Sequence, residues 1–315
     1  PLPSNLTPGV SPSLPQGAQS PGNLSTLGLD LSPAEIAKLY NFPLIGQDVA
    51  TGPIGLIEPG IGSALPADQT KTFQQLLTEY LASVGQSGTG QVKVQGANGQ
   101  SYDQGGAGER SLDVGVVASV NPNSDIYLFN GSGYNGNADA STFTAIQSAL
   151  WDPTLRAAVL SSSFGDDQSM SPNSPFYQAY RQLQIDAALK NVTLFNALGD
   201  GGSGNETGNG LTNLAYNETS AYNVMVGGTS LSTLTAAQND TTLNPSIVAP
   251  ALAGDRATLW QLMAGGLTSL PTDAATLQTF VEAVWNQYYV EGNHITIKNS
   301  PFEGGYLVNT TSSGG

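Results

Sequence analysis

Two carboxylates four residues apart are the side chains of this sequence whose types and spacing best suit acid–base chemistry. They are Glu109 and Asp113, in the segment Gly108-Glu-Arg-Ser-Leu-Asp113. On a helix, residues at this spacing lie one turn apart on the same face, where two like charges repel each other. Partial burial strengthens the repulsion, and a coupled, half-buried acid pair is a natural proton donor and acceptor. The alternative is a solvated helix face that carries two acids without a function.

A helix has to hold this pair, and the residues around it predict one over 109–120. Its apolar stripe is expected at every fourth position, which is the spacing of a face packed on a core: Leu112, Val116 and Val120. The row of Glu109 and Asp113 borders this stripe. Arg110 is expected to point away from the core.

Short apolar runs alternate with amphipathic segments through most of the chain. Strands are predicted over 54–58, 125–129, 158–162, 192–198 and 223–226. Helices are predicted over 33–42, 72–84, 109–120, 143–151 and 176–190, with a further one over 273–290. This alternation predicts an α/β fold, with a mostly parallel, doubly wound sheet and helices on both of its faces.

Ligands of such sheets bind at the carboxyl ends of the strands. Acidic or small residues follow the predicted strands at 58–60, 161–165, 196–201 and 227–229. Asp200 lies alone in a glycine-rich loop, a common way to present one side chain to a cleft. The alternative is a turn aspartate that bonds its own backbone.

The composition limits the classes of function. Only 10% of the residues are charged, yet 24 acids against 9 Lys and Arg give a formal net charge of −15. Once the acids are protonated, few charges remain to repel one another, so the chain suits an acidic environment. The sequence lacks the basic surface that nucleic acid requires and any apolar run that could span a membrane.

Zero cysteines exclude disulfides and thiolate chemistry, and the single histidine, His294, excludes a zinc site built from several histidines. Below about pH 5 an imidazole is protonated and cannot act as a base, whereas a carboxylate still can. We therefore expect His294, in a predicted short strand, to be structural. No metal ligands are predicted in this chain.

The domain organisation follows from shifts in composition. Residues 1–30 are rich in Pro, Gly and Ser and are expected to form an extended arm. Residues 31–315 are expected to form one domain, and about 232–283 look inserted within it.

Six segments, taken in chain order, resemble the sedolisins, the serine-carboxyl peptidases built on a subtilisin-like fold. They are Leu31–Pro43, Ile54–Gly62, Gly108–Asp113, Ser161–Gly165, Leu198–Gly204 and Val226–Leu231. Phe164 stands where the family has Trp, and Gly201 where its Gly-Asp-Ser-Gly has Ser. The resemblance covers about residues 31–231 and corresponds to the first part of the mature catalytic domain.

This resemblance implies roles for the acids. Glu109 would be the general base that takes the proton of a nucleophilic serine and passes it to the leaving amine, and Asp113 would orient Glu109. Asp200 would be a protonated oxyanion stabiliser, which low pH permits. The implied activity is that of an acid-acting endopeptidase or tripeptidyl-peptidase, secreted into acidic surroundings.

The resemblance also implies supporting residues. Glu58 would extend the acid network, and Ser163, Phe164 and Gly165 would line the site for a peptide substrate. The family's Ser-Gly-Thr-Ser-x-x-x-Pro segment and its Ca²⁺ site have no counterpart in this sequence. We expect the nucleophile and the Ca²⁺ on a second chain or a further C-terminal segment that completes the sheet. The family's pro-domain has no counterpart either, as expected of an autoprocessed mature form.

Two other functions remain open at the level of sequence. One is a secreted binding or surface protein on a catalytically dead scaffold of the same fold. The other is an acid glycosidase, which also uses two carboxylates. Those must flank the scissile bond, and a pair one turn apart on one helix does this poorly.

Overall fold

The computed structural model describes residues 32–40, 42–43, 48–68, 70–132, 141–166, 173–198, 220–233, 244–258, 280–284, 288–291 and 294–297. The chain divides into two compact units, one of residues 31–199 and 214–227, the other of residues 1–30, 200–213 and 228–315. The predicted arm, Asp200 and parts of the predicted insertion lie outside the described residues.

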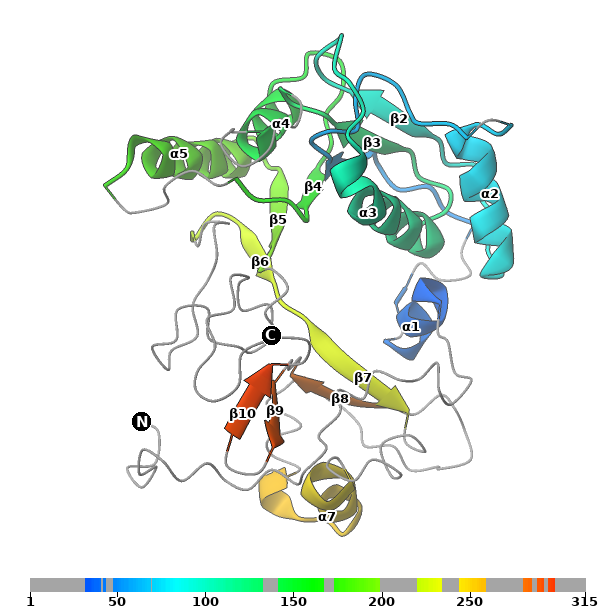
Figure 1. Ribbon diagram of the computed structural model, residues 1–315, viewed down its shortest axis with the longest axis vertical. Helices are drawn as coiled ribbons and strands as arrows, with labels where there is room; N and C mark the ends of the chain where they lie inside the picture. The colour runs from blue at the N-terminus through cyan, green and yellow to red at the C-terminus, as the bar shows by residue number, and fades with distance from the viewer. Residues whose placement is uncertain are drawn as a thin grey trace. The chain divides into compact units, whose positions relative to one another are not determined.

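A six-stranded sheet in the order β2-β3-β1-β4-β5-β6 forms the centre of the larger unit (Figure 1). Its strands are β1 (Ile54–Ile57), β2 (Val92–Gln95), β3 (Ile126–Phe129), β4 (Val159–Ser162), β5 (Thr193–Ala197) and β6 (Val224–Val226). Every neighbouring pair is parallel, which confirms the predicted parallel sheet. The alternation of apolar runs does not predict β2, because only two of its four residues are apolar.

Helices cover both faces of this sheet. They are α1 (Pro33–Leu39), α2 (Phe73–Ser83), α3 (Ala107–Val120), which follows the 3₁₀ turn η2 (Gln104–Gly106), α4 (Ser141–Leu150) and α5 (Pro175–Leu189). Consecutive residues of β1 belong to opposite cores: Leu56 packs with α2 and α3, and Ile57 with α4 and α5. Because side chains alternate along a strand, this split places the two helix pairs on opposite faces (Figure 1).

Local signals fix where the helices begin. At α2, Thr72 Oγ1 accepts a hydrogen bond from the backbone N–H of Gln75, whose side chain accepts one from the Thr72 N–H. Ser32 and Glu35 make the same reciprocal pair at α1, and Ser174 accepts from the N–H of Tyr177 at α5. Each such cap satisfies donors that the first helical turn leaves unpaired.

The predicted buried stripe of α3 is wrong. Leu112 and Val116 are 58% and 39% exposed. The buried residues of α3 are Arg110, Val114, Gly115, Ala118 and Ser119. Small residues explain why this face of α3 is buried instead of the predicted one. A Cβ at Gly115 would lie 3.3 Å from the ring of Tyr80 on α2, so the face with small residues lets α3 approach α2 closely.

The described part of the smaller unit contains two antiparallel pairs. β7 (Thr229–Thr233) pairs with β8 (Phe280–Val284), and β9 (Tyr288–Glu291) pairs with β10 (His294–Ile297). The π-helical turn η3 (Asn244–Val248) leads into the short helix α7 (Ala249–Leu252).

The predicted helix over 273–290 is wrong in its described part, which forms β8 and β9. These segments are rich in β-branched and aromatic residues, which suit strands when partner strands are available. His294 lies in a short strand as predicted. None of the helices in the described part of the chain is long and apolar enough to cross a membrane.

Candidate active site

The strand order makes the carboxyl end of β1 a switch point of the sheet. After β1 the chain forms β2 and β3 on one side of β1, and it then crosses to form β4, β5 and β6 on the other side. The order of the strands therefore reverses its direction at β1. In open α/β sheets, this switch point is where ligands bind. Glu58 follows β1 directly, and its backbone N–H donates to the Phe129 carbonyl at 2.9 Å. Glu58 is thus held at the switch point between β1 and β3.

Asn130 links the loops that follow β1 and β2 at this edge of the sheet. Its side-chain nitrogen donates to the carbonyls of Gly62 at 2.8 Å and Ala97 at 2.9 Å, and its oxygen accepts from the Ala97 N–H at 2.9 Å. Asn130 is 1% exposed. Although Asn130 begins an Asn-Gly-Ser sequon, its buried amide is committed to the backbone and is closed to a glycan.

Asp113 and Glu58 form the centre of the acid cluster. Glu58 is fully buried, and Asp113 is half-buried on α3. Ser163, just beyond β4, donates its hydroxyl to Asp113 Oδ1 at 3.0 Å. Asp113 Oδ2 and both carboxyl oxygens of Glu58 accept from no donor group in the described part of the chain, and the two carboxyls lie within hydrogen-bonding contact of each other. These three oxygens can take a proton from each other or from a bound group.

Burial raises the pKa of Glu58 well above its ordinary value, and the charge of Asp113 raises it further. Burial also raises the pKa of Asp113, against the smaller effects of its contacts with Ser163 and Glu58. Two adjacent buried carboxyls resist losing both protons, and the stronger burial of Glu58 raises its pKa more than the partial burial of Asp113 does.

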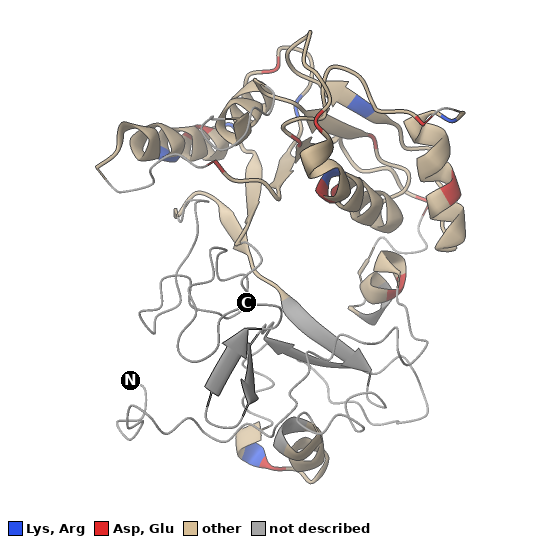
Figure 2. Cartoon of the chain, in the orientation of Figure 1, with Lys and Arg blue, Asp and Glu red and all other residues tan. Residues whose placement is uncertain are grey.

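Glu109 lies in the first turn of α3 and is partly exposed, one turn before Asp113. Its charge also raises the pKa of Glu58, so Glu109 is within electrostatic reach of the buried pair. Figure 2 shows charges of both signs meeting at the first turn of α3. The structure therefore brings the predicted acids of α3 and β1 into one electrostatic cluster.

The predicted substrate segment lies beside this cluster. Ser163 contacts Asp113, and Ser162 Oγ donates to the Phe164 carbonyl at 3.0 Å, which shapes the turn after β4. Gly165 follows and is exposed. The resemblance assigns Ser163 to substrate, whereas its hydroxyl also orients Asp113. Asp200 lies outside the described residues.

Sequence reasoning missed Arg110, which it directs to solvent. The structure buries this side chain to 2% exposure, and its guanidinium donates to the backbone carbonyls of Pro59 and Asp103. One signal could have found it: Arg110 is four residues before Val114, on the face of α3 that is buried.

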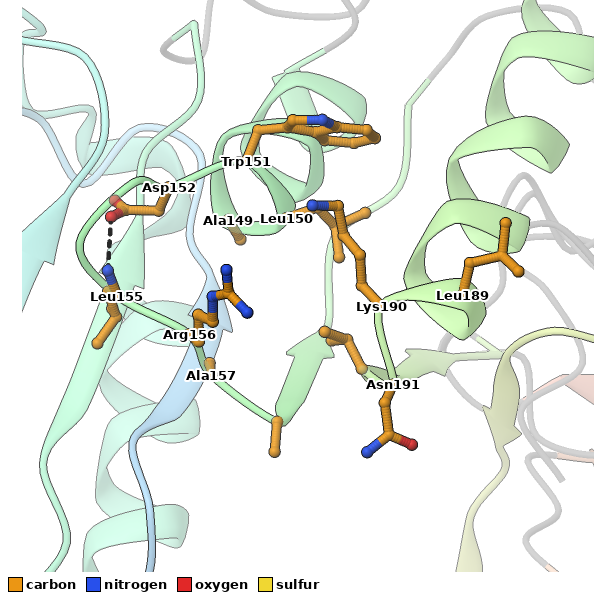
Figure 3. A pocket seen from close by; sticks show the side chains of 12 residues that line it. Ala149, Leu150, Trp151, Asp152, Leu155, Arg156, Ala157, Leu189, Lys190 and Asn191 are labelled. Atoms are coloured by element: carbon orange, nitrogen blue, oxygen red, sulfur yellow. Dashed lines mark hydrogen bonds between the residues drawn. The ribbon is translucent and has the colours of Figure 1, made fainter.

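No group of three or more His, Cys, Asp or Glu residues that could hold a metal ion occurs in the described part of the chain. A pocket of about 560 Å³ lies elsewhere in the same unit, between the ends of α4 and α5 and the starts of β4 and β5 (Figure 3). Trp151, Arg156 and Lys190 line it. It is at the amino ends of the strands, so it is separate from the acid cluster.

Comparison with known proteins relates this chain, over part of its length, to the sedolisins, a family of serine-carboxyl peptidases. Kumamolisin of Bacillus sp. (strain MN-32), a sedolisin, is 33% identical to it over 205 residues. These residues are 64% of this chain and 34% of kumamolisin, so the chain spans about a third of the length of that curated relative.

The search of solved structures matches Pseudomonas sedolisin (serine-carboxyl proteinase), complexed with two molecules of pseudo-iodotyrostatin. The TM-score is 0.49 at 21% sequence identity, over 64% of this chain and 55% of that one. No protein-family model matches the chain.

Proposed function

We propose that this chain carries the catalytic acids of an acid-acting serine-carboxyl peptidase, either an endopeptidase or a tripeptidyl-peptidase. The observation that supports this most is the acid cluster at the switch point, in which Asp113 accepts from Ser163 beside the buried carboxyl of Glu58. The kinship with kumamolisin supports the same class of chemistry.

In this proposal Glu109 is the general base. It removes the proton of the nucleophilic serine and returns it to the leaving amine, while Asp113 orients it. Ser163 holds Asp113 from the other side. The proton on Glu58 lets the buried cluster carry a single negative charge in acid, so the base remains usable where an imidazole is already protonated. Asp200 would stabilise the oxyanion as a neutral acid.

The nucleophile is proposed to lie on a second chain or a further segment that packs on this one. Apolar surface in the described part of the sheet supports this. Val159, on β4, is 37% exposed, and Val224 and Val226, both on the edge strand β6, are 42% and 47% exposed. Leu112 and Val116 add an apolar stripe on α3. A polypeptide that covers these residues would remove apolar surface from water.

Calcium is proposed for that further segment alone. The described residues offer no cluster of ligands for it, so no step of the reaction is assigned to the ion. Secretion into acidic surroundings is likewise a proposal, supported by the composition of 24 acids against 9 Lys and Arg.

The test uses the purified protein together with any polypeptide that stays bound to it. We expect it to cleave a denatured protein with an optimum below about pH 5. Glu109→Gln and Asp200→Asn should each lower turnover by at least about 10²–10³-fold with the circular dichroism spectrum unchanged. Glu79→Gln, on the exposed side of α2, and His294→Ala should retain parental rates.

An optimum above neutral pH, or near-parental rates in both acid variants, would contradict the proposal. Binding of peptide without turnover would favour the dead-scaffold alternative. Cleavage of a glycoside would favour a glycosidase. That reaction needs two carboxyls about 5 Å or more apart that flank the scissile bond. Glu109 and Asp113 on one helix, with Glu58 at the adjacent strand end, are poorly placed to flank a scissile bond from two sides.

A further inference from the structure

A buried cation lies within the acid cluster and has no role in the proposed reaction so far. Arg110 is 2% exposed, in a chain with only 9 Lys and Arg. Its Nη1 donates to the Pro59 carbonyl at 2.7 Å, its Nη2 donates to the Asp103 carbonyl, and its Nε has no partner among the described residues. A charge is rarely buried in this way unless it stabilises something nearby.

The guanidinium also lies against two aromatic rings. Its carbon is 5.4 Å from the ring centre of Tyr102 and 5.9 Å from that of Phe164, distances typical of cation–π contacts. Gly106 leaves the space for this arrangement. A Cβ there would lie 2.4 Å from Arg110 Nη1 and 3.2 Å from the Phe164 ring. One side chain thus joins the loop after β1, the approach to α3 and the turn after β4.

Among the residues that the structure describes, no carboxylate forms a direct ion pair with Arg110. The ion pairs found in the described part of the chain, Lys71–Glu79 and Lys93–Asp125, lie elsewhere. The titratable groups around Arg110 are Glu58 after β1, Glu109 and Asp113 on α3, and Asp103, whose carboxylate accepts from the Gly105 N–H. Arg110 opposes the rise in the pKa of Glu58.

We propose that Arg110 is a positioning residue of this site, which clamps Phe164 and the Pro59 loop against α3 and places a permanent positive charge beside the buried carboxyl of Glu58. A guanidinium suits both tasks, since it stays charged at every working pH and its planar fork donates in fixed directions. The catalytic consequence rests on the proposed peptidase function, whereas the effect on the acids does not.

The experiment compares Arg110→Met, which removes the charge, with Arg110→Lys, which keeps the charge and loses the fork. Lys93→Met is the matched control, because Lys93 is also a cation over an aromatic ring, Tyr127, but is exposed and near the start of β3. The first measurement is a ¹³C carboxyl NMR titration of Glu58, assigned with Glu58→Gln, which needs no activity.

We expect Arg110→Met to move the Glu58 titration to higher pH by about one unit, and Arg110→Lys and Lys93→Met to move it by much less. In the peptidase assay, the basic limb of the pH profile should shift upward in Arg110→Met, because Glu58 keeps its proton to higher pH. Arg110→Lys should keep the limb and raise KM by roughly three- to tenfold, because the Phe164 turn is no longer clamped.

Equal titrations in Arg110→Met and Lys93→Met would overturn the role of the charge, and an unchanged KM in Arg110→Lys would overturn the clamp. If Arg110→Met does not fold, Gly106→Ala replaces it. That variant keeps the charge but displaces the guanidinium, so its Glu58 titration should still move upward. A wild-type protein without peptidase activity would contradict the proposed function, while the titration would still decide the role of Arg110.

Discussion

At the scale of single residues, the site is defined by carboxyls whose surroundings differ. Glu58 is fully buried beside Asp113, whereas Asp113 is half-buried and accepts from Ser163. Burial therefore raises the pKa of Glu58 well above its ordinary value, while the Ser163 hydroxyl opposes the rise in the pKa of Asp113. Two acids of similar intrinsic pKa thus take different roles because one is more buried and less solvated.

The raised pKa of Glu58 predicts how stability depends on pH. A carboxyl whose folded-state pKa lies above its unfolded value stabilises the fold fully below the unfolded pKa, and this contribution is lost as pH rises through the folded pKa. Glu58→Gln stays neutral throughout. We expect the variant to match the parent at about pH 3 and to exceed it by about 1–2 kcal/mol at about pH 7.

Urea unfolding at the two pH values measures this difference. Glu79→Gln is the control, because Glu79 is exposed and its ion pair with Lys71 contributes less than about 1 kcal/mol. A Glu58→Gln variant that is less stable than the parent at neutral pH would show that the ionised Glu58 is well solvated or paired.

At the scale of elements, the site depends on loops that meet at one edge of the sheet. The turn after β4 presents Ser163 and Phe164, the loop after β1 presents Glu58, and α3 presents Asp113. Asn130, directly after β3, links the loops after β1 and β2 through its side-chain amide. The rigidity of this edge therefore rests on a few side-chain to backbone hydrogen bonds.

Asn130→Ala tests that dependence. The change removes three hydrogen bonds and leaves the buried carbonyl of Gly62 and the part-buried backbone groups of Ala97 without their partner, so we expect a loss of about 2–4 kcal/mol in the free energy of unfolding. Chemical denaturation measures it. Asn98→Ala, at a nearby exposed position, should change stability by less than about 0.5 kcal/mol. Equal losses in the two variants would mean that the Asn130 amide does not organise the edge.

At the scale of the whole molecule, the charge composition and the exposed apolar surface point to two conditions for function. With 24 acids and 9 Lys and Arg, the net charge falls in magnitude as pH drops and the acids protonate. The uncovered valines of the sheet and the stripe of Leu112 and Val116 on α3 are surface that another polypeptide could bury. Acid and a completing polypeptide are the two conditions under which we propose that the protein acts.

We therefore expect the purified protein to contain further polypeptide, either on the same chain or bound to it, that protects these residues. Intact mass spectrometry identifies the polypeptide, and hydrogen exchange of α3 and β6 with and without it measures the protection. An interface of this kind should be large and apolar, burying more than about 2,000 Å². A protein whose only polypeptide ends at Gly315, with the same exchange rates under all conditions, would contradict the expectation.

The sequence by itself determined the class of fold and the helix that carries Glu109 and Asp113. Apolar runs with clear periods predict β1, β3, β4 and β5 and the helices between them, because burial of those runs requires a sheet covered on both faces. The spacing of Glu109 and Asp113 predicts their shared face, since that depends only on helix geometry. The helix expected over 273–290 failed because a partner strand, which lies far away in sequence, decides between helix and strand there.

Only the tertiary structure decided which face of α3 is buried and what surrounds the acids. Leu112 and Val116 satisfy the helical period as well as Val114 and Ala118 do, and the choice between them depends on how closely α3 packs against α2 at Gly115. That choice turns Arg110 inward, toward Pro59, Tyr102 and Phe164, which come from other parts of the chain. The burial of Glu58 and the charges around it come from residues that are distant in sequence. The pKa of Glu58 therefore depends on the fold and not on the local spacing of residues.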